Sequence, residues 1–179
     1  MISLQPFNKT DFKQLLAWET DEEALMQFAG PSFSFPLTED QLELSLQDSN
    51  RLTYKVVHIK NNISIGHAEI YFPDNTTALL CRILIGDMNY RGKGLGLAVI
   101  NELLNISFAR PGIEEATLNV FDFNAAAIKC YTKAGFTVNE GKTKIRQLKN
   151  KTWTALNMSF SKTKWINLQA ASNAGIITK

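Results

Sequence analysis

A short glycine-rich segment with two cationic side chains is the part of this sequence best suited to chemistry. It lies between an apolar stretch, residues 78–85, and an amphipathic pattern over residues 95–108. Glycines let a backbone turn sharply and bring its N–H groups against a ligand, and a helix N-terminus adds about half a positive charge. The segment therefore predicts a site for a phosphate-bearing ligand. Its residues are Arg91, Gly92, Lys93, Gly94, Leu95 and Gly96.

The spacing of these glycines matches neither of the two common nucleotide-binding motifs. A P-loop needs Gly-Lys followed by Ser or Thr, whereas Lys93 is followed by Gly94. The dinucleotide motif G-x-G-x-x-G needs a third glycine, and that position holds Leu97 or Val99. A nucleotide-phosphate binder remains an alternative if the glycine segment is taken by itself.

An Asn and a Tyr seven residues apart form the second candidate feature. They are Asn124 and Tyr131, and Gly135-Phe136 follows them. Seven residues are nearly two helical turns, so the two side chains are expected on one face of a helix. Taken alone, Asn124 is a plain helix N-cap and Tyr131 is a residue of the hydrophobic core. Joined to the glycine segment, the pair favours a functional site.

The two segments together resemble the GCN5-related N-acetyltransferases, the GNAT family. Arg91, Gly94 and Gly96 match its R/Q-x-x-G-x-G/A motif between a strand and a helix, and the stretch from Asn124 to Phe136 matches its second segment. The resemblance covers residues 4–165, and its outer parts look like the branch of ribosomal-protein N-terminal and polyamine acetyltransferases. It implies an enzyme that moves an acetyl group from acetyl-CoA to a primary amine by direct transfer through a tetrahedral intermediate, without a metal.

The resemblance also implies which residues hold acetyl-CoA. The backbone of Leu84, Ile85 and Gly86 is expected to pair with the pantetheine arm as an added strand, and an N–H of this strand to stabilise the oxyanion. The glycine segment is expected to bind the pyrophosphate, and Asn124 and Tyr131 to face the cosubstrate.

Proton transfer is the part of the chemistry that the resemblance leaves open. An alkyl amine with a pKa of about 10.4 is mostly protonated at neutral pH, so a base or a water chain should assist. Some family members carry a Glu where this chain has Asn119, which cannot act as a base. Glu69 is the substitute candidate, with Asp87 behind it, although a salt-bridged carboxylate is the alternative for each. Tyr131 is the candidate acid for the CoA thiolate.

The acceptor is predicted only as a class: a small-molecule amine or a protein N-terminus. Aromatic residues of the early segments are expected to form one wall of its site, and they are Trp18, Phe28, Phe33 and Phe35. The missing Glu at Asn119 keeps a non-catalytic CoA-binding regulatory or interaction module of the same fold as an alternative. The branch also implies a homodimer.

Hydrophobic periodicity predicts the elements that position these residues. Helical patterns begin at Thr10, Glu22 and Thr38, and two more helices are expected over 95–108 and from Asn124 to Gly135. Strands are predicted over 54–59, 63–72, 78–85, 116–121, 142–148 and 152–160. The resemblance implies an α/β (α+β) fold with a central, mixed, mostly antiparallel twisted sheet of six to seven strands and about four helices. Residues 1–165 are expected to form one domain, and 166–179 a C-terminal tail.

Composition and charge restrict the other classes of protein to which the chain could belong. The 179 residues carry a net charge of +2, far from the dense basic surface of a nucleic-acid binder. Neither a signal peptide nor a run of roughly 18 apolar residues is present, so we expect a cytoplasmic protein without a membrane span. Two cysteines and two histidines show no disulfide framework and no zinc spacing.

Overall fold

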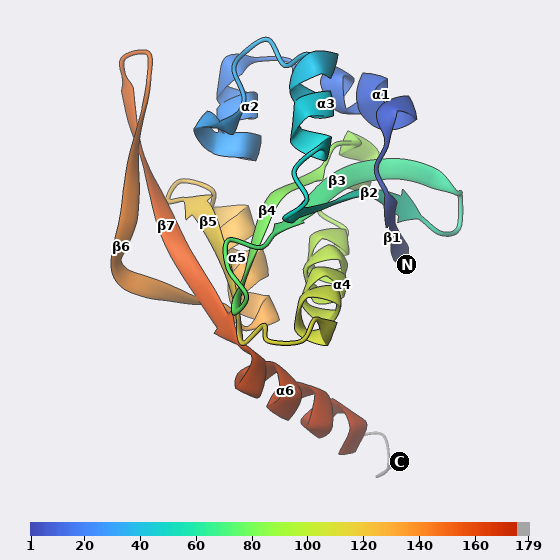
Figure 1. Cartoon of the computed structure of the whole chain (residues 1–179), viewed down its shortest axis with the longest axis vertical. Coiled ribbons are helices and arrows are strands. Elements are labelled where there is room, and N and C mark those ends of the chain that lie inside the picture. Colours follow the sequence, from blue (N-terminus) through green and yellow to red (C-terminus); the bar gives the residue numbers. More distant parts are fainter. Residues whose placement is uncertain (175–179) are drawn as a thin grey trace.

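A seven-stranded sheet forms the centre of the computed structural model, which describes residues 1–174, with side chains to residue 171 (Figure 1). The strand order is β1-β2-β3-β4-β5-β7-β6. All neighbouring strands pair antiparallel except β4 and β5, which pair parallel. The expected mixed, mostly antiparallel sheet is therefore confirmed. The strands are β1 (Ile2–Pro6), β2 (Arg51–His58), β3 (Ile63–Tyr71), β4 (Thr77–Ile85), β5 (Glu115–Phe121), β6 (Thr137–Leu148) and β7 (Lys151–Ser161).

Six α-helices accompany the sheet within residues 1–174, two more than the rough number expected. They are α1 (Phe12–Trp18), α2 (Glu22–Ala29), α3 (Glu39–Leu46), α4 (Leu95–Ala109), α5 (Ala125–Ala134) and α6 (Lys162–Ala174). The side chains of Asp21, Thr38 and Asn124 cap α2, α3 and α5 by accepting backbone N–H groups. Much of the expected tail is helical, since α6 extends to residue 174, and residues 175–179 lie outside the described part. None of the described helices is long and apolar enough to cross a membrane.

The central strand β4 is covered on both faces, as its apolar sequence predicted. Successive residues of a strand point to opposite sides of the sheet. Ile83 and Ile85 pack against the cluster that contains the buried face of α4, including Val99 and Leu103. Leu84 packs against the cluster formed by α1, α2 and α3. The sheet thus lies between two groups of helices.

The parallel strands β4 and β5 separate halfway along their length. Their register runs from Thr77 opposite Glu115 to Leu79 opposite Thr117 and ends there. Beyond this point β4 continues along β3, and β5 continues along β7 as far as Phe121 opposite Ala155. The sheet therefore opens between residues 80–85 of β4 and residues 119–121 of β5.

Besides α6, two structural features that bear on the site were not predicted from the sequence. Strand β1 pairs with β2, with Ile2 opposite His58 and Pro6 opposite Tyr54. Its five residues are too few for the alternating pattern to stand out. The second feature is a β-bulge between β3 and β4, where Arg82 adopts φ 49°. A positive φ is uncommon for a residue with a Cβ, and bulges of this kind redirect side chains.

Candidate active site

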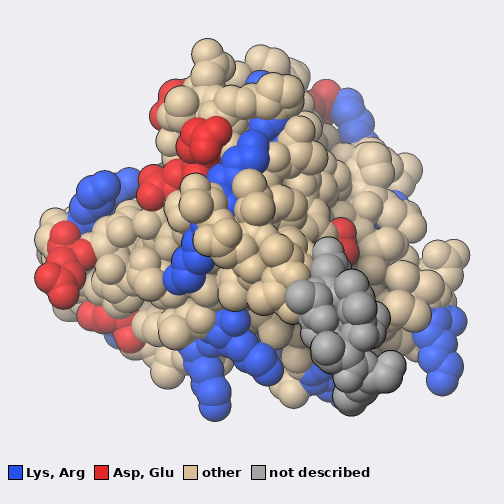
Figure 2. Space-filling model, turned by 90° about the horizontal axis from the view of Figure 1, so that it is seen from below, with Lys and Arg blue, Asp and Glu red and all other residues tan. Residues whose placement is uncertain are grey.

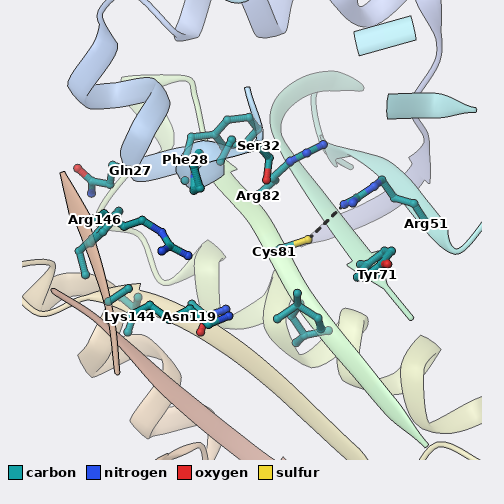
Figure 3. A pocket seen from close by; sticks show the side chains of 18 residues that line it. Gln27, Phe28, Ser32, Arg51, Tyr71, Cys81, Arg82, Asn119, Lys144 and Arg146 are labelled. Atoms are coloured by element: carbon teal, nitrogen blue, oxygen red, sulfur yellow. Dashed lines mark hydrogen bonds between the residues drawn. The ribbon is translucent and has the colours of Figure 1, made fainter. Parts of the chain in front are cut away.

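Two adjoining cavities occupy the opening between β4 and β5. The larger, of about 850 Å³, extends from the opening to the glycine segment and the first turns of α5. The smaller, of about 320 Å³, lies between α2, the opening and β6 (Figure 3). Both are lined by the same stretch of each separated strand, residues 80–82 and 119–121, and by Gln27 and Phe28. The cavities therefore meet where the two strands part.

The glycine segment borders the larger cavity with its backbone. Gly92 and Gly94 have φ 72° and 75°, so each has a conformation that a side chain would strain. A Cβ at either position would meet no atom within 4 Å, which shows open space in front of the loop. Helix α4 begins at Leu95, and the first N–H groups of a helix have no acceptor within it. This arrangement suits the pyrophosphate of acetyl-CoA.

The expected residues of the cosubstrate site divide into two groups. Those that line the larger cavity are Leu84, Ile85, Arg91, Gly92, Gly94, Leu95, Gly96, Asn124 and Tyr131. The side chain of Arg91 folds back to β4, where its Nε donates to the carbonyl oxygen of Ile85 at 2.7 Å. Lys93 does not line the cavity, and its Nζ lies 5.6 Å from the ring centroid of Tyr90.

Gly86 also lies outside the cavity lining, and its neighbours explain why. Its N–H donates to the carbonyl oxygen of Ile65 at 2.9 Å, so it is already used inside the sheet. A Cβ on Gly86 would lie 2.0 Å from Cδ2 of Trp18. The glycine therefore allows α1 to pack closely on the end of β4, and its N–H is not available to the pantetheine arm, so the contact implied for Gly86 stays a prediction for its carbonyl oxygen alone.

Asn124 and Tyr131 both face the larger cavity, as their spacing predicted. The Oδ1 of Asn124 accepts the N–H of Ala127 at 3.2 Å and so caps α5. Tyr131 is partly buried, and burial, with a smaller effect of Cys130, raises the pKa of its hydroxyl well above the usual range. At neutral pH the hydroxyl is therefore protonated and can donate a hydrogen bond, while the raised pKa makes full transfer of its proton less favourable.

Glu69 is almost completely buried and is held by cations. Its carboxylate accepts hydrogen bonds from Nη1 of Arg51 at 2.6 Å and from Nη1 of Arg82 at 3.2 Å, and lies 2.9 Å from Nε2 of His67. Burial would raise the pKa of Glu69, but the bond to His67 and the nearby charges outweigh it and lower the pKa to about 2. A carboxylate with this pKa takes up a proton poorly, and Glu69 lines neither cavity.

The remaining residues considered for the site differ in whether they line a cavity. Asp87 caps a short 3₁₀ turn by accepting the N–H of Asn89 at 2.9 Å. Asn119 lies where the cavities meet, and its Oδ1 accepts a hydrogen bond from Nδ2 of Asn157 at 3.2 Å. Of the aromatic residues, Trp18 lines the larger cavity and Phe28 both; Phe33 and Phe35 line neither.

Glu19 is a candidate that sequence reasoning missed. It follows α1, lines the larger cavity, and is 6% exposed, yet its Oε2 has no hydrogen-bond partner within the described residues. Burial and the charge of Asp21 raise the pKa of Glu19 to about 7, while Arg91 acts in the opposite direction. A Glu at the end of a short helix is ordinarily solvated, so the sequence held no signal for this position.

Comparison with known proteins identifies the fold and the chemistry. A family model described as an acetyltransferase (GNAT) domain matches residues 2–137. The structure of spermidine N-acetyltransferase from Vibrio cholerae, in complex with CoA and spermine, has a TM-score of 0.78 at 18% identity, over 92% of this chain and 98% of that chain. Aminoglycoside acetyltransferase AAC(6′)-Ib in complex with coenzyme A has a TM-score of 0.72 at 19% identity, over 94% and 99%.

The chain therefore belongs to the GNAT family of acetyltransferases. It is an acetyl-CoA-dependent N-acetyltransferase with acetyl-CoA as cosubstrate, as the two sequence motifs predicted. Because the chain belongs to this family, the alternative of a nucleotide-phosphate binder unrelated to acetyl transfer is excluded. At these identities the two solved structures show the shared fold.

Proposed function

We propose that the protein acetylates the primary amine of a small molecule, with acetyl-CoA in the larger cavity and the acceptor in the smaller one. The observation that carries this proposal is the shared lining of the two cavities at residues 80–82 and 119–121. A donor and an acceptor that enter from the two sides would meet between the separated strands. The smaller cavity, about 320 Å³, is at the lower end of small-molecule sites, which span about 300–1,000 Å³.

The direct test is release of CoA thiol from acetyl-CoA in the presence of a panel of amines and N-terminal peptides. Release with a small amine, and acetylation of that amine by mass spectrometry, is the expected result. Release with peptides alone would contradict the small-molecule part of the proposal.

For the donor we propose binding along β4 and at the glycine segment. The backbone of Leu84 and Ile85 borders the cavity and can pair with the pantetheine arm, while the loop from Arg91 to Gly96 offers N–H groups and charge to the pyrophosphate. The Nε of Arg91 donates to the Ile85 carbonyl, and its two Nη groups can donate to the ligand. Gly86 is reassigned to packing, and Lys93 contributes charge at the rim.

For proton transfer we propose Glu19 as the base and Tyr131 as the acid. Both line the larger cavity, and because Glu19 does not line the smaller one, its free oxygen would receive the amine proton through water in the larger cavity. Loss of that proton leaves a neutral amine, which attacks the thioester carbonyl to form the C–N bond. As the C–S bond breaks, the hydroxyl of Tyr131 passes its proton to the departing thiolate, and the second proton of the amine nitrogen passes through water to the Tyr131 oxygen and restores the hydroxyl. Glu69 instead holds Arg51 and Arg82 in place.

Three further expectations stay predictions. They are the cytoplasmic location, the homodimer, and the folding of residues 1–165 as one domain. Sedimentation of the purified protein measures the second, and thermal unfolding of a chain ended after Trp165 measures the third.

A further inference from the structure

The smaller cavity has a strongly basic lining. Four of its side chains are cationic: Arg51, Arg82, Lys144 and Arg146. None of the described residues that line it is Asp or Glu. The whole chain has a net charge of +2, and Figure 2 shows both signs interspersed over much of one face. Positive charge is therefore concentrated locally in the cavity where we place the acceptor.

Two of the cations form one wall of the cavity and are held by side chains that do not line it. Arg51 and Arg82 both donate to Glu69, at 2.6 and 3.2 Å, and Arg51 also lies 3.7 Å from Asp48. Arg82 donates to Oγ of Ser45 at 2.7 Å, and its guanidinium lies 3.9 Å from the ring centroid of Phe33. These contacts hold the two guanidinium groups at the cavity, and their two positive charges are met by the carboxylates of Glu69 and Asp48.

The other two cations come from the opposite wall and are not compensated. Lys144 and Arg146 alternate on β6, so both side chains lie on the same face of the strand (Figure 3). Arg146 donates to the carbonyl oxygen of Ile145 at 3.1 Å, and neither side chain has a salt-bridge partner within residues 1–171. Figure 3 shows Arg146 directed from its strand toward the space between the walls.

Two other lysines of the hairpin formed by β6 and β7 do have salt-bridge partners. At its tip, Lys149 pairs with Glu22 at 3.0 Å and Lys151 pairs with Glu23 at 2.5 Å, both on α2. Acidic residues are thus present on the helix that faces the hairpin, but they contact its tip and do not line the cavity. Lys144 and Arg146 remain available to a ligand.

Resting on the proposed function, we propose that the acceptor is a small primary amine that also carries a carboxylate or phosphate group, bound through Arg146 and Lys144. Arg forms paired charge-assisted hydrogen bonds with either anion. A polycationic acceptor would instead bring like charges together. The same cations favour the neutral form of the acceptor amine, because a nearby like charge disfavours protonation.

The first experiment compares acceptors that differ only in the anion. Thiol release is measured with tyrosine against tyramine, lysine against cadaverine, and phosphoethanolamine against ethanolamine, with spermidine as the polycation. We expect at least one anionic member to have a kcat/KM about tenfold or more above its partner, as expected for one hydrogen-bonded charge. The first two pairs test a carboxylate and the third a phosphate.

The second experiment removes the cations. Arg146→Gln and Lys144→Gln are expected to raise the KM of the anionic acceptor about tenfold, with the KM for acetyl-CoA unchanged. Lys142→Gln is the matched control, because Lys142 is exposed on the same strand and lines neither cavity. Arg146→Glu should shift preference toward the uncharged or cationic member of each pair. Thermal unfolding of each variant reports whether it is folded.

The outcomes separate this proposal from the function on which it rests. Acetylation of spermidine or of the anion-free amines in preference to their partners overturns the anionic acceptor and leaves N-acetyl transfer to small amines standing. An unchanged KM in both glutamine variants overturns the roles of Arg146 and Lys144. No thiol release with any small amine, with acetyl-CoA bound, contradicts both proposals.

Discussion

Glu19 and Glu69 have pKa shifts in opposite directions because their neighbours differ. Glu69 is surrounded by Arg51, Arg82 and His67, which stabilise its ionised form. Glu19 is also buried but lacks a hydrogen-bond partner for Oε2 among the described residues, and Asp21 adds negative charge. A carboxylate with a pKa near 7 can exchange protons under physiological conditions, whereas one with a pKa of about 2 stays ionised.

We predict that Glu19→Gln lowers kcat/KM at pH 7.5 about tenfold or more, because the base is lost. The rise of wild-type activity through pH 7, where Glu19 ionises, should be absent in the variant. A pH–rate profile of both proteins checks this, and an identical profile would remove Glu19 from the mechanism.

The same shift affects stability. The folded-state pKa of about 7 exceeds the ordinary value of 4.5, so the folded protein holds the proton more tightly than the unfolded chain. The contribution of the Glu19 carboxyl group to the free energy of unfolding therefore falls as the pH rises from about 4.5 through 7. Glu19→Gln should lack this decline, which thermal unfolding at pH 5 and pH 8 measures.

For Tyr131→Phe we predict a loss of turnover of about tenfold or more with little change in acetyl-CoA affinity. The variant keeps the ring in the cavity and removes the proton donor for the thiolate. Steady-state kinetics and acetyl-CoA titration measure the two quantities. Wild-type turnover in this variant would show that another group, or solvent, protonates the thiolate.

At the scale of elements, the network around Glu69 connects three neighbouring strands. Arg51 belongs to β2, Glu69 to β3 and Arg82 to β4. We predict that Glu69→Gln lowers the unfolding free energy by about 3–5 kcal/mol, because the buried guanidinium of Arg82 and the partly buried one of Arg51 lose their counter-ion. Glu43→Gln is the control, since Glu43 pairs with Lys9 at the surface and should cost about 1 kcal/mol or less.

The pH dependence of this network has a defined sign. Glu69 has a folded-state pKa of about 2, below its ordinary 4.5, so its stabilisation is complete above pH 4.5 and is lost as pH falls through 2. The difference between wild type and Glu69→Gln should therefore shrink in that window. Chemical unfolding at a series of acidic pH values measures it, and a constant difference would argue against the ion network.

Contact between α1 and β4 depends on the absence of a side chain at Gly86. We predict that Gly86→Ala lowers stability by about 1–3 kcal/mol, because the ring of Trp18 must move away from the new methyl group. Gly96→Ala is the comparison, since its Cβ would lie 3.5 Å from Sγ of Cys130, an ordinary contact. Urea unfolding should show equal or higher stability for the second variant and a lower midpoint for the first.

Periodicity and capping predicted most elements because those signals are local. Thr38 and Asn124 cap their helices as expected, and six of the seven strands were predicted. The roles of Glu69, Gly86 and Glu19 depend on residues distant in sequence, such as Arg82, Trp18 and Arg91, and local patterns contain no such information. The two family motifs indicated the donor site, whereas the acceptor side consists of residues that no motif connects.

At the scale of the whole molecule, the two cavities and their junction predict the kinetic order. Cys81 borders both cavities, but burial and Glu69 raise the pKa of its thiol to about 12, so it is a poor nucleophile. We predict a sequential mechanism in which both substrates bind before transfer. Initial-rate plots at several acceptor concentrations should intersect; parallel lines, or an acetylated protein in mass spectra, would indicate a covalent intermediate.

The β6–β7 hairpin lies on the β5 side of the opening between β4 and β5, so we expect that this hairpin can be replaced without changing the acetyl-CoA site. The family match ends at residue 137, where β6 begins, so the hairpin that carries Lys144 and Arg146 lies beyond it. The glycine segment and Tyr131 lie in the matched part, whereas the two side chains that we propose for the acceptor anion lie on a strand that pairs only with β7. Grafting a β6–β7 hairpin of different charge onto this chain should therefore change which amines are acetylated while the handling of acetyl-CoA stays the same.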